Sequence, residues 1–315
     1  MTRTIALRFA QLVLVLFLVS VLVFLLLELL PGDTATAIAA NSGDHSEKAI
    51  AAIQQQLGLD RPLPVRFADW LGGVLHGDFG TSYNNGQDIW AAISERFPVS
   101  IQLIVFAELI SLAVAVPLAT YVSQRRDGLA DRITTALCFT GQAMPNFMLA
   151  LLLILFLAVK MKLFPAVGYV PMSQGLFAST KSILIPALAL SGGLIPVYVR
   201  VLRNELVRTL QEDFILVGRS LGIPRWKLLL RYALKPASPT LITVVGVNIG
   251  TLLGGTVLVE VISGIPGLGT LMLTSIQTWD YQVVQGVVLV VAAVYVLCNF
   301  LVDMLHLVVD PRVRS

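Results

Sequence analysis

Residues 9–30 of this chain read FAQLVLVLFLVSVLVFLLLELL, an almost unbroken apolar run whose only charged residue is Glu28. About 20 apolar residues suffice to cross the ~30 Å hydrocarbon core of a bilayer, because a helix rises about 1.5 Å per residue. The run therefore predicts a membrane span. Arg3, Arg8 and Ala35-Thr36-Ala37 give it some features of a secretory signal. Its apolar part is far longer than that of a signal peptide, so we expect an uncleaved anchor.

Comparable runs recur along the chain. Of the 315 residues, 56% are hydrophobic and 13% are charged, whereas about 25% of residues are charged in soluble domains. This composition argues against a soluble enzyme, a disordered chain and a nucleic-acid-binding protein, and it makes the lipid bilayer the expected environment. We therefore predict an all-α membrane protein with six transmembrane helices. Their ranges are about 9–30, 99–123, 133–159, 182–202, 241–262 and 283–309.

The distribution of Lys and Arg over the loops predicts the orientation. With a cytoplasmic N-terminus, the inner segments carry 15 of the 22 basic residues and the outer segments carry 7. Cytoplasmic loops carry the excess of basic residues, so both termini are predicted to be cytoplasmic. Lys160, Lys162 and Lys181 lie in one outer loop and run against this trend.

The lengths of the connections divide the chain into three parts. We expect an N-terminal segment with the first span (1–30), an extracytoplasmic helical cap (31–97) and a core with the other five spans (98–315). Within the cap, helices are predicted at about 46–57 and 65–75, and the second places Phe67, Trp70, Leu71 and Val74 on one face.

The cytoplasmic loop 203–240 is strongly basic and has a helical pattern that a glycine interrupts. Apolar residues recur at helical spacing from Leu206 to Leu221, Gly222 then breaks the helix, and Pro224 begins a second helix that is predicted to end near Pro236. Such a segment fits two roles, an interfacial element that binds anionic lipid headgroups or a docking element for a cytoplasmic partner. Periodicity alone does not separate them.

Several short motifs, in this order and spacing, resemble those of ABC importer permeases of the dipeptide/oligopeptide/nickel family. Residues 212–215 (EDFI) and 218–223 (GRSLGI) are similar to the coupling loop of these permeases. The other matching motifs are LPGD at 30–33, LGLDRPL at 57–63, GDFGTS at 77–82, VEVI at 259–262, PGLG at 266–269, DY at 280–281, VQG at 284–286 and DPRVR at 310–314.

The resemblance implies a type I ABC importer permease in the cytoplasmic (inner) membrane of a prokaryote. It implies as partners a homologous second permease, two ABC ATPase subunits and an extracytoplasmic solute-binding protein. ATP and Mg would bind to the ATPase subunits, and no cofactor is expected on this chain. Residues 212–231 would transmit the motion of the ATPases to the spans. The expected coupling residues are Glu212, Asp213, Phe214, Arg219, Gly222 and Arg225.

Motifs for catalysis on this chain are absent or lack their context. No Gly-Lys pair occurs, so the chain has no P-loop, and neither H-E-x-x-H nor C-x-x-C is present. Residues 218–222 satisfy G-x-S-x-G, but a basic amphipathic helix precedes Ser220 where a hydrolase has a strand. His45 and His76 have no histidine partner at helical spacing, so a peptide-like solute is favoured over nickel.

Prolines and glycines inside two spans suggest where a pathway could lie. Pro186, Gly192-Gly193 and Pro196 are expected to break or kink the fourth span, and Pro145-Asn146 gives a weaker signal in the third. Irregular backbone at that depth is tolerated only against protein or a water-filled cavity. In the fifth span, Gly246, Gly250 and Gly254 form a double G-x-x-x-G, which fits packing within the bundle or against a second permease.

Charged residues inside the spans need a partner or a polar surface. Glu108 lies within the second span, whereas Glu28 and Glu260 lie near span ends and are expected to reach the membrane surface. The last span carries a polar stripe, which fits a helix seam, an ion relay or contact with the pathway. Its members are Tyr295, Asn299, Asp303 and His306.

Two rival functions stay open beside a permease that forms half of an importer's pathway. An ion-coupled secondary transporter would use Asp303 and His306 as a relay and would work without ATPase subunits. A membrane scaffold or lipid-binding protein would need no polar pathway. The irregular fourth span argues against the scaffold.

Overall fold

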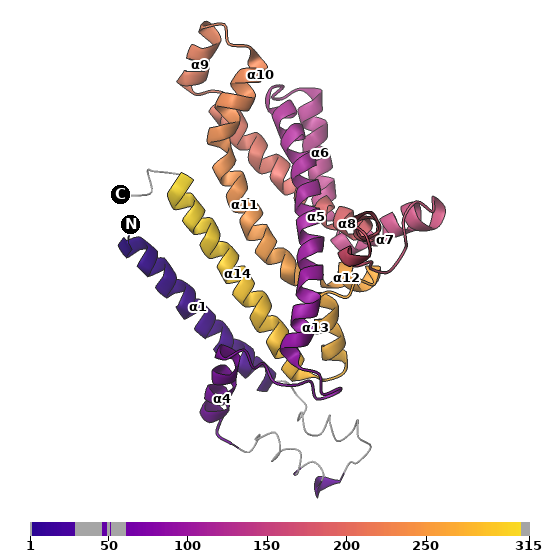
Figure 1. Cartoon of the computed structure of the whole chain (residues 1–315). Coiled ribbons are helices and arrows are strands. Elements are labelled where there is room, and N and C mark those ends of the chain that lie inside the picture. Colours follow the sequence, from indigo (N-terminus) through magenta and orange to yellow (C-terminus); the bar gives the residue numbers. More distant parts are fainter. Residues whose placement is uncertain (1, 29–45, 49–50, 52–60, 310–315) are drawn as a thin grey trace. The chain divides into compact units, whose positions relative to one another are not determined.

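The computed structural model describes residues 2–28, 46–48, 51 and 61–309 (Figure 1). Apart from one isolated antiparallel bridge between Thr81 and Asp88, the regular structure of these residues is helical. The elements are α1 (Thr2–Glu28), α4 (Leu63–Leu75), α5 (Ile89–Ser123), α6 (Leu129–Ala143), α7 (Asn146–Leu153), η1 (Ile154–Lys160), η2 (Met172–Gln174), α8 (Leu176–Thr209), α9 (Asp213–Ser220), α10 (Arg225–Lys227), η3 (Leu228–Ala233), α11 (Leu234–Gly255), α12 (Val257–Ser263), α13 (Leu268–Gln277) and α14 (Tyr281–Val309).

Within the described chain, five helices are long and apolar enough to cross a membrane. Two bent helix pairs pass the same test, and if each pair is counted as one span, the number of spans rises to as many as seven. The five are Leu7–Leu25, Ile89–Ser123, Leu176–Thr209, Arg225–Gly255 and Tyr281–Leu305. They cover the predicted first, second, fourth, fifth and sixth ranges. A bent pair, α6 with α7 and η1, covers the third. The predicted all-α membrane fold is therefore confirmed.

The third span is not one straight helix. Its two halves meet at an angle of 98°. Met144 adopts an extended conformation with φ −90° and ψ 122°, and Pro145 precedes the first residue of α7. A proline disfavours a helical conformation in the residue before it, so the break follows from Pro145. Pro145-Asn146, which gives the weaker of the two sequence signals for irregular backbone, thus marks the break in the third span.

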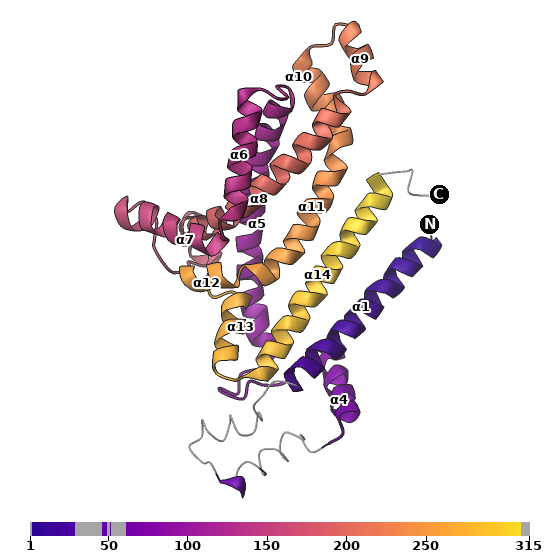
Figure 2. The same cartoon turned by 180° about the vertical axis from the view of Figure 1, so that it is seen from behind.

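The sequence predicts that the fourth span breaks or kinks, and the break is wrong. α8 continues from Leu176 to Thr209 through both Pro186 and Pro196, and both prolines are buried. Each proline removes only one backbone hydrogen bond, and neighbouring helices can stabilise a span across such a loss. α6, α7 and α11 pack against α8 and provide these neighbours, as both views of the cartoon show (Figures 1 and 2).

The chain forms two compact units. One comprises residues 101–265 and 298–315, and α8 lies at its core with α6, α7 and α11 around it. The other comprises residues 2–100 and 266–297. Its buried apolar core is formed by Ile89, Ala92, Ile93, Leu268, Leu271, Val283 and Val287.

The second helix predicted for the cap is present as α4 and packs against α1. The ring centroid of Phe24 lies 5.4 Å from that of Phe67 and 5.8 Å from that of Trp70. Phe67 and Trp70 belong to the predicted apolar face, so this face is what joins α4 to α1. Most of the helix predicted at 46–57 lies outside the described residues.

Candidate functional site

The helix–glycine–helix predicted for the cytoplasmic loop is present. α9 ends at Ser220, and Gly222 has a φ of +75°, in the left-handed region that favours glycine. The N–H of Gly222 donates to the carbonyl of Arg219 at 3.0 Å, and the N–H of Ile223 donates to that of Gly218 at 3.1 Å. This pair of bonds is the Schellman ending of a helix. α10 then begins at Arg225, after Pro224.

The outer bounds of this element differ from the prediction. The apolar spacing from Leu206 to Leu221 predicted one helix, but residues 210–212 form a turn between α8 and α9. The turn has three residues, close to the ~3.6 residues of one helical turn. The apolar residues on its two sides therefore keep a helical spacing in the sequence, although the helix itself is interrupted. The second helix also does not end near Pro236. A π-helical stretch, η3, carries α10 directly into α11, and such widened turns occur where a helix accommodates an irregularity.

α9 and α10 expose large apolar side chains. The exposed fractions are 49% for Phe214, 57% for Val217, 74% for Leu221 and 65% for Trp226. We call these four residues the docking patch. Ile215, between Phe214 and Val217, is fully buried and anchors α9. Phe214, Val217 and Leu221 follow one another at helical spacing, and exposed apolar side chains on one face mark a site for a partner protein or a membrane.

The charged coupling candidates occupy two different places. Glu212 directly precedes α9 and Asp213 lies in its first turn, where the positive end of the helix dipole favours negative charge. Arg219 and Arg225 line a cavity of about 300 Å³ together with Arg126, which the sequence reasoning did not select.

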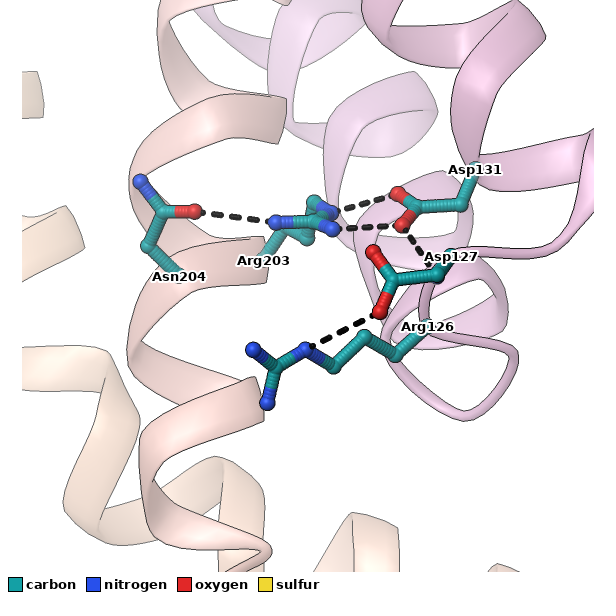
Figure 3. Close-up of polar contacts among 5 residues, drawn as sticks. All are labelled: Arg126, Asp127, Asp131, Arg203 and Asn204. Atoms are coloured by element: carbon teal, nitrogen blue, oxygen red, sulfur yellow. Dashed lines mark hydrogen bonds and ion pairs between the residues drawn. The ribbon is translucent and has the colours of Figure 1, made fainter.

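An ion pair that the sequence reasoning missed joins α6 to α8 (Figure 3). Arg203 Nε lies 2.5 Å from Oδ1 of Asp131, and Arg203 Nη2 lies 2.5 Å from Oδ2 of the same carboxylate. The backbone N–H of Asp127 donates to Asp131 at 3.0 Å, and Arg203 Nη1 donates to Asn204 Oδ1 at 3.1 Å. The side chain of Asp131 is only 4% exposed. The sequence gives only a weak signal for this pair, because it shows no more than two opposite charges at the predicted inner ends of neighbouring spans.

Two of the charges predicted within the spans, those of Glu108 and Glu260, have hydroxyl groups as partners. The hydroxyl of Tyr198 in α8 lies 2.9 and 2.8 Å from the two carboxyl oxygens of Glu108 in α5. Glu260 is fully buried, and the Thr256 hydroxyl donates to it at 3.0 Å. The expectation that Glu260 reaches the membrane surface is therefore wrong, because a local hydroxyl group replaces water. The side chain of Glu28 lies outside the described residues.

A second polar set lies where the chain enters α8. The Tyr169 hydroxyl donates to Gln102 Oε1 at 2.7 Å, and Gln102 Nε2 donates to the Ser179 hydroxyl at 3.0 Å. Burial raises the pKa of the Tyr169 hydroxyl, so this group stays protonated and remains a donor. The set ties the segment before α8 to the start of α8 and to α5.

Three of the pathway candidates come together where α7 crosses α8. A Cβ on Gly193 would lie 2.5 Å from Asn146 Oδ1, and one on Gly192 would overlap the Leu149 side chain. The two glycines thus allow α7 to approach α8 closely. Pro196 instead lines a separate cavity of about 180 Å³ beside Arg200 and Cys138.

The polar stripe of the last span lies on α14. Asn299 and Asp303 are half-buried there. Val302, next to Asp303, occupies the space where a Cβ of Gly246 would lie. The first glycine of the double G-x-x-x-G therefore packs within this chain, whereas Gly254 has no atom within 4 Å of the position of its Cβ.

Gly193→Ala should lower the stability of the protein, because the new methyl group displaces the Asn146 side chain. Overpacking against a tight core costs about 1–3 kcal/mol. Here only the end of the Asn146 side chain has to move, and alanine gains up to about 1 kcal/mol over glycine inside a helix, so the net loss should be at most about 1 kcal/mol. The measurement is thermal unfolding in detergent. The control is Gly254→Ala, which should be neutral or slightly stabilising. Combining Gly193→Ala with Asn146→Ala should restore part of the loss, and no restoration would contradict the predicted clash.

Comparison with known proteins gives a consistent result over the whole chain. Residues 112–315 match the family described as binding-protein-dependent transport system inner membrane component, and residues 1–104 match the N-terminal region of such membrane components. The chain is 32% identical over 319 residues to the dipeptide transport system permease protein DppB of Escherichia coli, with 94% of each protein covered. It is 35% identical over 314 residues to a Brucella abortus protein whose name places it among peptide transport system permeases, with 100% of this chain and 99% of that protein covered.

A solved structure shares the fold. The structure is an inward facing conformation of the MetNI methionine ABC transporter. The match has a TM-score of 0.58 at 16% identity and covers 70% of this chain and 96% of that chain. At this level of identity the likeness concerns the fold alone.

Proposed function

Because this chain belongs to the family of binding-protein-dependent transport system inner membrane components, and is thus a permease component of an ABC importer, we propose that it forms half of the translocation pathway for a peptide-like solute. The relatives support this choice of solute. Those named for peptide or dipeptide transport match the chain over 94% or more of its length.

The proposed assembly contains a homologous second permease, two cytoplasmic ABC ATPase subunits and an extracytoplasmic solute-binding protein. ATP and Mg²⁺ bind to the ATPase subunits, and this chain catalyses no covalent step. Both termini face the cytoplasm of a prokaryotic cell. The excess of basic residues in the inner segments supports this orientation.

The docking patch is the observation that carries the proposal. Phe214, Val217, Leu221 and Trp226 present apolar surface on a rigid pair of short helices, which suits insertion into a groove of an ATPase subunit. Buried Ile215 fixes α9 to the rest of its unit, and η3 continues into α11. Closure of the ATPase pair on ATP binding would therefore move α9 and α11 together.

The transport cycle follows alternating access. ATP binding closes the ATPase pair, and α9 and α10 pass this motion to α8 and α11. The pathway then opens outward to receive the solute from the binding protein, and hydrolysis returns it to the inward-open state. The contact between α7 and α8 at Asn146 and Gly193 is closed in this structure, and we propose that it forms part of the wall of the pathway.

Affinity purification of the tagged chain in a gentle detergent tests the proposed assembly. We expect the wild-type chain to recover the second permease and ATP-hydrolysing subunits. Leu221→Asp should lower recovery of the ATPase subunits at least about tenfold, because it would bury an unpaired charge in the interface. Recovery of the second permease should not change.

The matched control is Phe177→Asp, since Phe177 is 84% exposed and lies at the other end of α8. It should leave ATPase recovery unchanged. A chain that purifies alone in several detergents and in nanodiscs, without ATPase activity, would overturn the proposal. The ion-coupled transporter would then be the better account, and Asp303 would be the first residue to change.

A further inference from the structure

The cavity behind α9 and α10 has an unusual lining. Its lining comes from the end of α5 and the turn that follows it, the end of α8 and the turn that follows it, α9, α10 and the start of η3. Its volume is about 300 Å³. The lining residues are Ser123, Gln124, Arg126, Val207, Leu210, Gln211, Arg219, Arg225, Leu228 and Leu229.

Three arginines from three separate segments line this cavity, and no Asp or Glu does. Within the part of the chain that the structure describes, Arg219 and Arg225 form no ion pair. Arg126 lies 3.6 Å from the exposed carboxylate of Asp127, and its charge also acts on the Asp131 carboxylate. Such an exposed pair contributes little, so Arg126 is available to a better ligand. Three positive charges around one space repel one another unless an anion lies between them.

The position of the cavity indicates the source of an anion that would bind between these arginines. α5 and α8 are membrane-spanning helices that end here, and the helix that crosses as α11 begins here. α5 has 35 residues and α8 has 34, more than the roughly 20 that cross a bilayer, so the cavity at their ends lies at the headgroup level or just beyond it. The buried side chains of Leu228 and Leu229 line the cavity together with its arginines. Basic pockets between spans at this level suit anionic lipid headgroups.

We propose that Arg126, Arg219 and Arg225 form a site for a phosphate group, supplied by an anionic phospholipid such as phosphatidylglycerol. Arginine binds phosphate through paired N–H groups, and three such groups surround the phosphate oxygens. The lipid would brace α9 and α10 against the ends of α5 and α8. This site goes beyond the proposed transport function and does not depend on it.

Native mass spectrometry of the detergent-purified protein, exchanged into mixed phosphatidylglycerol and phosphatidylcholine, tests the site. We expect the wild type to retain phosphatidylglycerol in preference to phosphatidylcholine. Arg126→Gln should reduce this retention at least about fivefold. The matched control is Arg125→Gln, because Arg125 lies in the same turn but donates to the Tyr121 hydroxyl and does not line the cavity.

A second variant keeps the test valid if Arg126→Gln fails to fold. Gln211→Glu places a carboxylate in the lining and should also expel the lipid. Titration calorimetry with inorganic phosphate in phosphatidylcholine nanodiscs separates the two sources. Heat that Arg126→Gln abolishes, without phosphatidylglycerol retention, would support a phosphate site fed from solution. Equal retention of the lipid by the wild type, Arg126→Gln and Gln211→Glu, with no phosphate heat, would overturn the proposal.

Discussion

Gly222→Val should abolish transport while the protein still inserts into the membrane. Gly222 has a φ of +75°, and a β-branched residue in this region costs on the order of 1–2 kcal/mol. The two Schellman bonds would break to relieve this strain, and Leu221 and Trp226 would no longer share one surface. Uptake of a labelled peptide should fall to background, and membrane fractionation should show a normal amount of protein.

Gly222→Asn is the matched control, since asparagine tolerates the left-handed conformation better than other residues with a side chain. It should keep most of the transport activity. Normal uptake by Gly222→Val would show that α9 and α10 do not form the coupling element. Loss of uptake in both variants, with normal insertion, would indicate that the new side chain and not the backbone is responsible.

The turn at Gly222 could be predicted because its cause is local. A glycine after an amphipathic helix and before a proline has few alternatives, and the structure has the expected Schellman ending. The spans could be predicted for a similar reason, because length and apolar composition are properties of one segment.

Other features depend on neighbours that no single segment reveals. Pro145 ends a helix, whereas Pro186 and Pro196 lie inside one, although all three have the same backbone chemistry. The difference is that α8 lies at the core of its unit, where packing on several sides stabilises a helix across the missing hydrogen bonds. The partners of Glu108 and Asp131 likewise come from α8, 90 and 72 residues away.

The pair of Asp131 and Arg203 shows the consequence of such a distant contact most clearly. Arg203→Ala should destabilise the protein by about 3–5 kcal/mol, because it leaves the Asp131 carboxylate buried without its counter-charge. Thermal unfolding in detergent measures this loss. Arg203→Lys should have an intermediate effect, since lysine keeps the charge but not the two parallel contacts that the guanidinium makes (Figure 3).

Exchanging the two residues tests whether the pair itself is responsible. The double variant Asp131→Arg, Arg203→Asp should be more stable than either single variant, because opposite charges again face each other across α6 and α8. The rescue should be partial, for two reasons. The N–H of Asp127 donates to the Asp131 carboxylate, and the first turn of α6 favours a negative charge. If Arg203→Ala unfolds at the wild-type temperature, or if the exchange is no better than the single variants, then the contact does not stabilise the link between α6 and α8.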